Sequence, residues 1–264
     1  MESNNIIKAI MMGIVEGVTE FLPVSSTGHL IVFSYLIDFK ESFSQAFEIS
    51  VQAGAILAVF FLYSVEFKKI IYCKDFKLFF NLLISFLPIA IVGLIFGEII
   101  FLNLFFPTPV AFAFIIGGIL LIFIENRYKT IKENEVVNFS QITKSVAFRV
   151  GIVQTLSLIP GFSRSGAAII GGMYFGLSRS LATKFSFFLA VPVILAASFY
   201  SIILQNSVIS YDDLPVFLIG LTSSFFSALL IIKWFIKFVS NKSLVIFGYY
   251  RIFVGFLILY FVNF

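Results

Sequence analysis

The sequence predicts an all-α polytopic membrane protein. Of its 264 residues, 60% are hydrophobic and 12% are charged, whereas a soluble domain carries about 25% charged residues. The mean hydropathy of +1.06 agrees with this class. The alternating pattern of transmembrane barrel strands does not appear, so helices are expected to cross the membrane. The net charge of +4 follows from the loops and indicates no nucleic-acid partner.

Six segments are apolar over the roughly 20 residues that a helix needs to cross a bilayer. They comprise residues 45–64, 78–100, 109–125, 183–204, 214–236 and 244–262. The third segment is short and is expected to extend at its ends. The opening Met-Glu-Ser-Asn-Asn lacks the basic region of a signal peptide, so no cleavage is expected. Residues 1–264 are therefore predicted to form a single integral membrane domain.

Two other apolar regions, residues 5–37 and 145–177, resemble each other. Each contains Gly-Ile-Val followed by an acid or its amide, then a break at proline and a cluster of serine and glycine. The apolar pieces on either side of the break are about a dozen residues long, which is too short to span. They favour a re-entrant helix-loop-helix hairpin that returns on the side it entered. Two ordinary crossings in each region are the alternative.

Basic residues indicate the orientation, because cytoplasmic loops are enriched in lysine and arginine. Of the 18 such residues, 14 lie in loops 65–77 and 125–149, beside the second hairpin, or at the end of the fifth span. These parts are predicted to be cytoplasmic. Three spans separate the two hairpins, so the hairpins would enter from opposite faces as an inverted repeat. Its halves would be about 5–125 and 145–262, with the N-terminus outside.

Glu16 and Glu20 are four residues apart, so they share one face of a helix. Two carboxylates this close in apolar surroundings repel each other unless a cation or a proton joins them. Mg²⁺ and Ca²⁺ prefer carboxylate oxygens, so the pair is a candidate metal site, and a proton site is the second interpretation. Carboxylates that face water at the membrane rim or cap the backbone are the structural alternative.

Pro23 precedes a cluster of hydroxyl groups, a glycine and the one histidine of the chain. The cluster consists of Ser25, Ser26, Thr27, Gly28 and His29. A proline break followed by a helix N-terminus directs backbone N–H groups toward one place, which suits an anion. His29 lies one turn after Ser26 and could act as base or acid toward a serine or a phosphate. An ordinary N-cap and a buried, hydrogen-bonded histidine are the structural alternatives.

The second hairpin carries a matching cluster with one guanidinium. It consists of Gly161, Ser163, Arg164, Ser165 and Gly166. Arg164 can bind phosphate through two parallel hydrogen bonds, and an arginine at membrane depth is costly without an anion. A salt bridge from Arg164 to Glu16 or Glu20 is the alternative, and it is compatible with a site. Arg251, in the last span, is interpreted as snorkelling to the cytoplasmic face and is left out of the site.

The two clusters together combine two acids, a histidine, an arginine, hydroxyl groups and backbone donors. A diphosphate suits the arginine and the donors, but the two carboxylates would repel it unless a divalent cation bridges them. The sequence therefore predicts a metal-dependent phosphoryl-transfer site.

The two motifs identify a resemblance to the bacterial undecaprenyl-diphosphate phosphatase family, also called the bacitracin-resistance family. The similarity extends over essentially the whole chain, and the two long motifs together are highly specific. The matching stretches are Glu16-Gly-Val-Thr-Glu20-Phe-Leu-Pro-Val-Ser-Ser-Thr-Gly-His29, Pro160-Gly-Phe-Ser-Arg-Ser-Gly166, Phe185-Ser-Phe-Phe-Leu-Ala-Val-Pro192 and Tyr250-Arg251-Ile252. The second motif departs from the family at Ala168, where threonine is usual, so Ser165 or a water would have to replace that hydroxyl.

The resemblance implies an enzyme of the bacterial cytoplasmic (inner) membrane with an outward-facing site. It would remove the terminal phosphate of undecaprenyl diphosphate with Mg²⁺ or Ca²⁺, recycle the lipid carrier for peptidoglycan, and confer resistance to bacitracin, which sequesters the substrate. By position, it implies metal ligands Glu16 and Glu20 and catalytic residues Ser26, His29, Arg164 and Glu20. Arg164 would also bind the phosphate, with Ser163 and Ser165 beside it. The further expected substrate contacts are Ser25, Thr27, Gly28, Gly161 and Gly166.

Three nucleophiles remain open: Ser26 with His29 as its base, His29 itself, or water. A lipid-phosphate or proton-coupled transporter is the rival class, because inverted repeats and broken helices are typical of transporters. Lipid phosphatases of the acid-phosphatase type are excluded, because their chemistry needs two histidines and this chain has one. The expected partners are a polyprenyl diphosphate and membrane lipids. The sequence leaves open a homo-oligomer, the prenyl chain length and the choice of metal.

Overall fold

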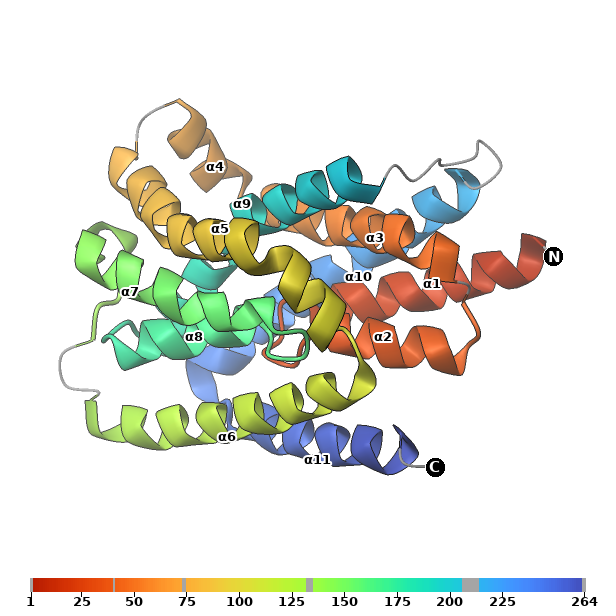
Figure 1. Ribbon diagram of the computed structural model, residues 1–264. Coiled ribbons are helices and arrows are strands. Elements are labelled where there is room, and N and C mark those ends of the chain that lie inside the picture. Colours follow the sequence, from red (N-terminus) through yellow and green to blue (C-terminus); the bar gives the residue numbers. More distant parts are fainter. Residues whose placement is uncertain (1, 40, 73–74, 132–134, 206–213, 263–264) are drawn as a thin grey trace.

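The computed structural model describes residues 2–39, 41–72, 75–131, 135–205 and 214–262, which are mostly helical (Figure 1). Their α-helices are α1 (Glu2–Thr19), α2 (Ser26–Leu36), α3 (Glu41–Leu62), α4 (Ser64–Ile71), α5 (Phe76–Leu104), α6 (Pro107–Ile131), α7 (Lys144–Gln154), α8 (Arg164–Tyr174), α9 (Arg179–Gln205), α10 (Leu214–Asn241) and α11 (Val245–Val262). Two 3₁₀ helices, η2 (Phe139–Gln141) and η3 (Thr155–Leu158), flank α7. Within these ranges the β structure is limited to one isolated bridge between Val136 and Leu177.

Four helices in the described ranges are long and apolar enough to cross a membrane. They are α5, α6 over Pro107–Tyr128, α9 over Arg179–Tyr200, and α10. A fifth candidate combines α3 with α4, which meet at a bend of 85°, and α11 is apolar but shorter. The all-helical class with several candidate spans is therefore confirmed. The short third segment extends as expected, because α6 has 25 residues.

The two regions of similar sequence, residues 5–37 and 145–177, each form a pair of helices joined by a tight turn. In the first pair α2 packs against α1, and in the second α8 packs against α7, with η3 at the turn. Figure 1 shows the first pair at the end of the molecule that carries the N-terminus and the second pair at the opposite end. The two turns meet in the middle, where Ser165 of the second pair donates to the Leu22 carbonyl of the first at 2.7 Å.

Equivalent glycines pack the first helix of each pair against a long helix. Gly13 and Gly151 open the two Gly-Ile-Val sequences. A Cβ on Gly13 would collide with the Gly220 carbonyl of α10, and a Cβ on Gly151 would collide with the Ser85 carbonyl of α5. Ser85 also donates to the Ala147 carbonyl of α7 at 2.6 Å. Glycine therefore permits a backbone contact that fixes the position of each pair.

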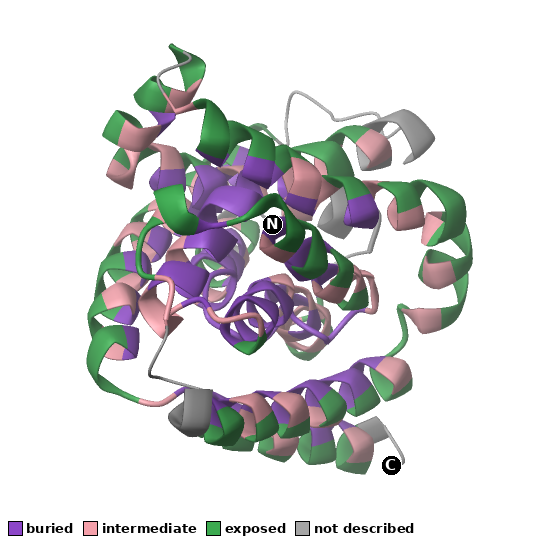
Figure 2. Ribbon diagram, turned by 90° about the vertical axis from the view of Figure 1, so that its left-hand side faces the viewer, coloured by how far each residue is buried: buried purple, intermediate pink, exposed green. Residues whose placement is uncertain are grey.

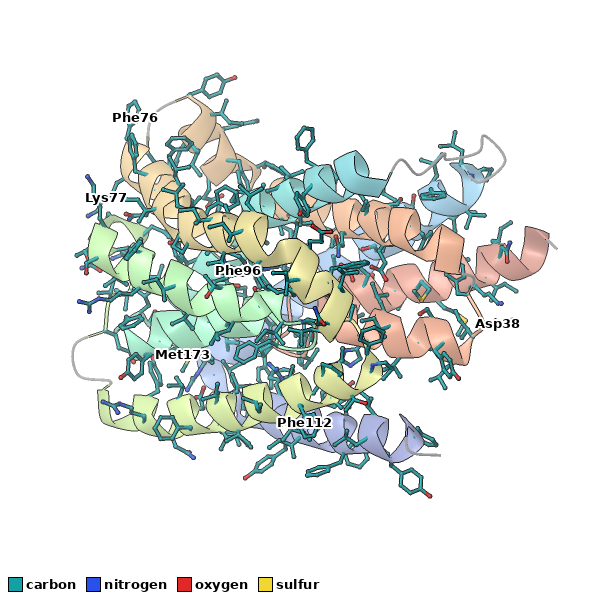
Figure 3. The ribbon with its side chains drawn as sticks, in the orientation of Figure 1. Asp38, Phe76, Lys77, Phe96, Phe112 and Met173 are labelled. Atoms are coloured by element: carbon teal, nitrogen blue, oxygen red, sulfur yellow. The ribbon has the colours of Figure 1, made fainter. Side chains whose placement is uncertain are left out.

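Burial separates a protein-packed centre from an apolar outer surface. Buried residues gather in the centre of the molecule and exposed residues at its periphery (Figure 2). In α8 every residue from Ser165 to Met173 is buried. Phe96 and Phe112, which project from α5 and α6 in Figure 3, are 49% and 52% exposed. An outer surface of this kind marks the part of the molecule that contacts lipid.

Charge is distributed unevenly between the two ends. Lys77 lies at one end, and Asp38 lies at the other (Figure 3). α4, which carries Lys68 and Lys69, lies at the same end as Lys77, whereas both chain termini lie at the opposite end (Figure 1). These three lysines therefore lie at the end of the molecule opposite the chain termini.

Gly151→Ala is expected to destabilise the second hairpin, because the new Cβ would lie against the Ser85 carbonyl. Overpacking of this kind costs about 1–3 kcal/mol. Gly93→Ala in α5 is the matched control, because its Cβ would be 3.5 Å from the nearest side-chain atom, an ordinary contact. Thermal unfolding of the purified proteins in detergent measures the effect. Equal melting temperatures for the two variants would contradict the packing described for Gly151.

Candidate active site

Two serines at the hairpin turns adopt the same unusual backbone conformation. Ser25 has a φ of 70° and Ser163 a φ of 77°, a region that residues other than glycine rarely occupy. Each caps the following helix: the Gly28 N–H donates to Ser25 Oγ at 3.4 Å, and the Gly166 N–H donates to Ser163 Oγ at 3.1 Å. Counting from the paired Gly-Ile-Val sequences makes the two serines equivalent. The hairpins thus share one backbone frame at their turns.

Glu20 connects the two hairpins. Its Oε1 pairs with Nη2 of Arg164 at 2.7 Å, and its Oε2 accepts a hydrogen bond from the Ser26 hydroxyl. The side chains of Glu20 and Arg164 are only 8% and 10% exposed, so their attraction is stronger than it would be in water. The structure therefore brings the acid and the hydroxyl of the first motif together with the guanidinium of the second.

The guanidinium of Arg164 is also held by α9. Its Nη1 donates to the Ser186 carbonyl at 2.8 Å and to the Ser186 hydroxyl at 3.3 Å. Its Nε is buried and has no hydrogen-bond partner among the described residues, so this N–H group remains available to a ligand. Sequence analysis did not single out Ser186, although a serine inside the apolar Phe-Ser-Phe-Phe run was the available signal.

Two predicted substrate contacts already bond within the protein. Ser165 donates to the Leu22 carbonyl, and its hydroxyl lies 3.1 Å from that of Ser163. Both serines are at most 5% exposed. These hydroxyl groups therefore stabilise the contact between the turns.

The predicted glycines have a packing reason for their identity. A Cβ on Gly28 would collide with the Phe114 ring, and one on Gly161 with the Val110 carbonyl. Gly161 also has a φ of 93°, which favours glycine. Gly166 leaves little room for a Cβ beside Ser163. Thr27, the predicted substrate contact that precedes Gly28, is partly exposed.

Both ring nitrogens of His29 have partners. Nδ1 lies 2.7 Å from the Ser25 carbonyl, and Nε2 lies 2.6 Å from the Tyr250 hydroxyl. A carbonyl can only accept, so Nδ1 carries the proton and the neutral ring accepts from Tyr250 through Nε2. The Ser26 hydroxyl donates to Glu20 rather than to His29. Tyr250 was not predicted, because it comes from α11 at the far end of the chain.

The interpretation of Arg251 as a snorkelling residue is wrong. Its side chain is 1% exposed, and its guanidinium donates to three carbonyl oxygens in the protein interior. The acceptors are Pro23 at 3.3 Å, Gly161 at 3.1 Å and Ala113 at 3.1 Å. The position of Arg251 early in the last span suggested that it lies at the membrane edge. In the structure α11 packs beside both hairpin turns, so Arg251 lies in the protein interior.

Glu16 is fully buried, and neither of its carboxylate oxygens has a hydrogen-bond partner in the part of the chain that the structure describes. Its charge interacts with those of Glu20, Glu48 and Arg164. Gln154, its counterpart in the second hairpin, is also buried with an unpartnered amide in that part. No group of three or more histidine, cysteine, aspartate or glutamate side chains in the described ranges is arranged around an ion position. The unpartnered oxygens of Glu16 are nevertheless available to a further ligand.

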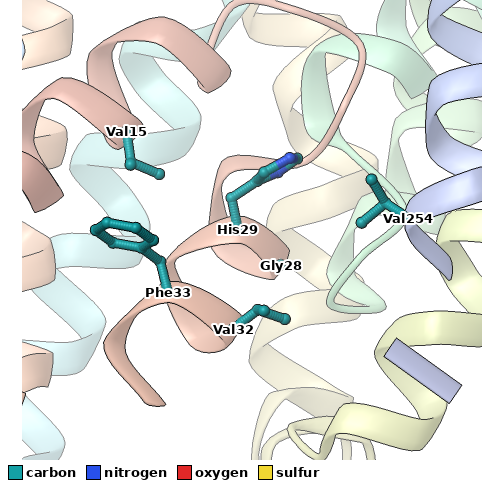
Figure 4. A pocket seen from close by; sticks show the side chains of 6 residues that line it. All are labelled: Val15, Gly28, His29, Val32, Phe33 and Val254. Atoms are coloured by element: carbon teal, nitrogen blue, oxygen red, sulfur yellow. The ribbon is translucent and has the colours of Figure 1, made fainter. Parts of the chain in front are cut away.

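An apolar cavity of about 130 Å³ adjoins His29 (Figure 4). Val15, Val32, Phe33 and Val254 line it from α1, α2 and α11. Such a lining suits hydrocarbon rather than phosphate. The polar cluster is therefore bordered on the His29 side by space for an apolar group.

The fold and the site define a multi-pass helical membrane protein with a polar cluster at the meeting point of two hairpins. A family model described as bacitracin resistance protein BacA matches residues 9–257. The chain belongs to this family. Similar proteins include the undecaprenyl-diphosphatases of Nitrosospira multiformis, with 46% identity, and of Herminiimonas arsenicoxydans, with 44%. Each match covers 96% of this chain and 94% of the relative.

Glu20→Gln and Arg164→Met are each expected to destabilise the fold, because each leaves one charge of a buried pair without its partner. Losing one member of such a pair costs about 3–5 kcal/mol. The double variant should lose less than the sum of the two, because it removes both charges together. Thermal unfolding in detergent of the wild type, the two single variants and the double variant gives the double-mutant cycle. Additive losses would show that the two side chains do not stabilise each other.

Proposed function

We propose that this chain is a membrane phosphatase that hydrolyses undecaprenyl diphosphate to undecaprenyl phosphate and inorganic phosphate. The observation that carries the proposal is the Glu20 carboxylate, which holds both the Ser26 hydroxyl and the Arg164 guanidinium. A hydroxyl, a base and a phosphate-binding cation are the groups that phosphoryl transfer needs. Relatives matched over nearly the whole chain carry the name undecaprenyl-diphosphatase.

The product, undecaprenyl phosphate, is the lipid carrier that the family resemblance connects with peptidoglycan synthesis. Bacitracin sequesters the diphosphate form, so an enzyme that consumes this form confers resistance. The family name, bacitracin resistance protein BacA, agrees with this consequence.

The contact between Ser26 and Glu20 supports an attack by the serine hydroxyl. Glu20 accepts the proton while Ser26 Oγ bonds to the terminal phosphorus, and the bond from that phosphorus to the bridging oxygen breaks. Undecaprenyl phosphate leaves with the electron pair of that bond. Water then attacks the phosphorus of the phosphoserine and the bond from phosphorus to Ser26 Oγ breaks. Glu20 returns its proton to Oγ, and inorganic phosphate leaves with the protons of the water. His29 or water as the nucleophile are the two alternatives.

In this proposal Arg164 binds the phosphate and His29 takes part in proton transfer. The unpartnered Nε of Arg164 is a donor for a phosphate oxygen, and Ser186 anchors the other side of the guanidinium. The positive charge stabilises the negative charge on the transferring phosphoryl group. His29 carries its proton on Nδ1, and its Nε2 accepts a hydrogen bond from the Tyr250 hydroxyl, so His29 serves as a proton acceptor only when Tyr250 gives up this bond.

We further propose that Glu16 and Glu20 hold Mg²⁺ or Ca²⁺ together with the substrate. The buried oxygens of Glu16 lack partners among the described residues, and Glu20 lies one helical turn away. The residues present fit such an ion, because Mg²⁺ is commonly bound by one or two carboxylates plus substrate phosphates rather than by a complete protein cage. When bound, the ion would neutralise phosphate charge that the two acids otherwise repel.

The proposed placement is the bacterial cytoplasmic membrane, with six crossings, two re-entrant hairpins and an outward-facing site. Lys68, Lys69 and Lys77 lie at the end opposite the chain termini, and basic residues favour the cytoplasm. The first hairpin, which carries Ser26 and His29, lies at the terminal end and would open outward. Three of the four hairpin helices, α2, α7 and α8, have 11 residues each and support re-entry rather than crossing. The fourth, α1, has 18 residues and is longer than the sequence predicted.

Transport of a lipid phosphate is the second candidate function. Two hairpins that extend from opposite ends and meet in the middle match the broken-helix architecture of secondary transporters. Purified protein in detergent separates the candidates, because a transporter needs two compartments and a phosphatase does not. Release of phosphate from undecaprenyl diphosphate in detergent, with a divalent cation present, supports the enzyme.

Ser26→Ala and His29→Ala are expected to reduce phosphate release strongly. Loss of general acid–base catalysis costs about 10²–10⁴-fold, and loss of the nucleophile should cost at least as much. Ser240→Ala is the matched control, because Ser240 is exposed and bonds only locally to the Ile236 carbonyl. Steady-state phosphate release measures the rates, and rapid quench followed by mass spectrometry identifies the phosphorylated residue. Near-normal turnover in either variant rejects the role of that residue.

Glu16→Gln is expected to raise the divalent-ion concentration for half-maximal activity by roughly tenfold or more, a cost seen when support of a metal site is lost. Glu98→Gln in α5 is the control, because Glu98 is exposed. Titration of Mg²⁺ into chelator-treated enzyme gives the activity curve, and Tb³⁺ luminescence follows ion binding directly. Unchanged curves for Glu16→Gln would exclude Glu16 as a ligand.

A further inference from the structure

The guanidinium of Arg251 contacts the two hairpin turns at equivalent positions. Nη1 donates to the Pro23 carbonyl, and Nη2 donates to the Gly161 carbonyl. Counting from the paired Gly-Ile-Val sequences aligns Pro23 with Gly161. Each of these residues lies two positions before the serine that caps α2 or α8. One side chain thus holds the same backbone atom of both turns.

The residues around Arg251 leave space that fits a planar cation. The guanidinium carbon lies 5.9 Å from the centre of the Phe114 ring and 5.8 Å from that of Phe162, which are cation–π distances. Gly117 of α6 makes the space, because a Cβ there would overlap the guanidinium. These contacts fit the shape of arginine, so lysine would not replace it.

Arg251 is also a buried cation whose hydrogen-bond partners are neutral. Its hydrogen bonds go to carbonyl oxygens, and Arg251 forms no ion pair with an acid in the described ranges. A charge at membrane depth is costly and usually has a functional reason. Carbonyl groups freed by a break in a helix need donors when water is excluded. Arg251 supplies those donors to both turns together.

We infer that Arg251 is a positioning residue that fixes the two hairpin turns relative to each other, so that Ser26 and Arg164 face the same phosphate. Ser26 lies three residues after Pro23, and Arg164 lies three residues after Gly161. A small relative shift of the turns would separate the nucleophile from the phosphate binder without changing either side chain. Arg251 itself acts through the backbone and needs no contact with the substrate. The inference rests on the proposed phosphatase function.

Arg251→Lys tests this inference, since lysine keeps the charge and loses the planar fork. We expect kcat to fall about 10²-fold, as a misplacement near 1 Å produces. KM should stay within about threefold, because the groups that bind the lipid are intact. The control is Arg179→Lys: Arg179 is a largely buried arginine paired with Glu125 near the start of α9. It should lose stability and keep its kcat.

A second measurement does not depend on activity. Hydrogen–deuterium exchange of peptides that cover residues 20–28 and 159–166 should accelerate in both turns of Arg251→Lys and in neither turn of Arg179→Lys. If Arg251→Lys folds poorly, Gly117→Ala tests the same contact while it keeps the arginine in place in the sequence. Its new Cβ should displace the guanidinium and reproduce the kcat loss, and adding Arg251→Lys to it should cause little further loss.

The outcomes separate the inference from the proposed function. Wild-type kcat together with unchanged exchange in both turns of Arg251→Lys overturns the positioning role and leaves the phosphatase intact. Fully additive losses in Gly117→Ala and Arg251→Lys also overturn it. Failure of the wild-type protein to release phosphate refutes the function, whereas the exchange comparison still decides whether Arg251 fixes the turns.

Discussion

An isolated charge at the centre of a bilayer costs about 3 kcal/mol or more, so Glu20 and Arg164 depend on each other. Their ion pair forms only where the turns of the two hairpins meet. That meeting requires the hairpins to approach from opposite ends, and it requires close packing at Gly13 and Gly151. The Glu20–Arg164 ion pair and the arrangement of the two hairpins therefore stabilise each other in the membrane.

The broken helices impose a second constraint, because irregular backbone is tolerated at membrane depth only where protein groups satisfy it. Here side chains from other elements supply the donors. Ser165 bonds the Leu22 carbonyl, and Arg251 bonds the carbonyls of Pro23 and Gly161. The turns thus combine a buried polar cluster with backbone carbonyls that side chains of other elements satisfy. This support explains how two serines keep a strained conformation at the site.

Local patterns in the sequence were sufficient for the helical class, for the two hairpins as broken helices, and for the residues of both turns. The ion pair of Arg164 with Glu20 was the predicted alternative to phosphate binding, in which Arg164 bonds to Glu16 or Glu20. Ser186, Tyr250 and Arg251 were missed because their roles arise from contacts made by α9 and α11, far along the chain. Tyr250 and Arg251 sit in an apolar helix, where spacing alone cannot tell a lipid-facing side chain from one that points into the protein.

The two hairpins share a backbone frame but differ at the positions that carry chemistry. Ser26 aligns with Arg164, and Glu16 aligns with Gln154. Two copies of the first hairpin would gather four carboxylates and repel a phosphate, whereas two copies of the second would offer arginines without a nucleophile. The shared serine caps keep the turns alike, so the side chains could diverge without disturbing how the hairpins meet. One hairpin then contributes the hydroxyl and the acids, and the other contributes the cation that holds the phosphate.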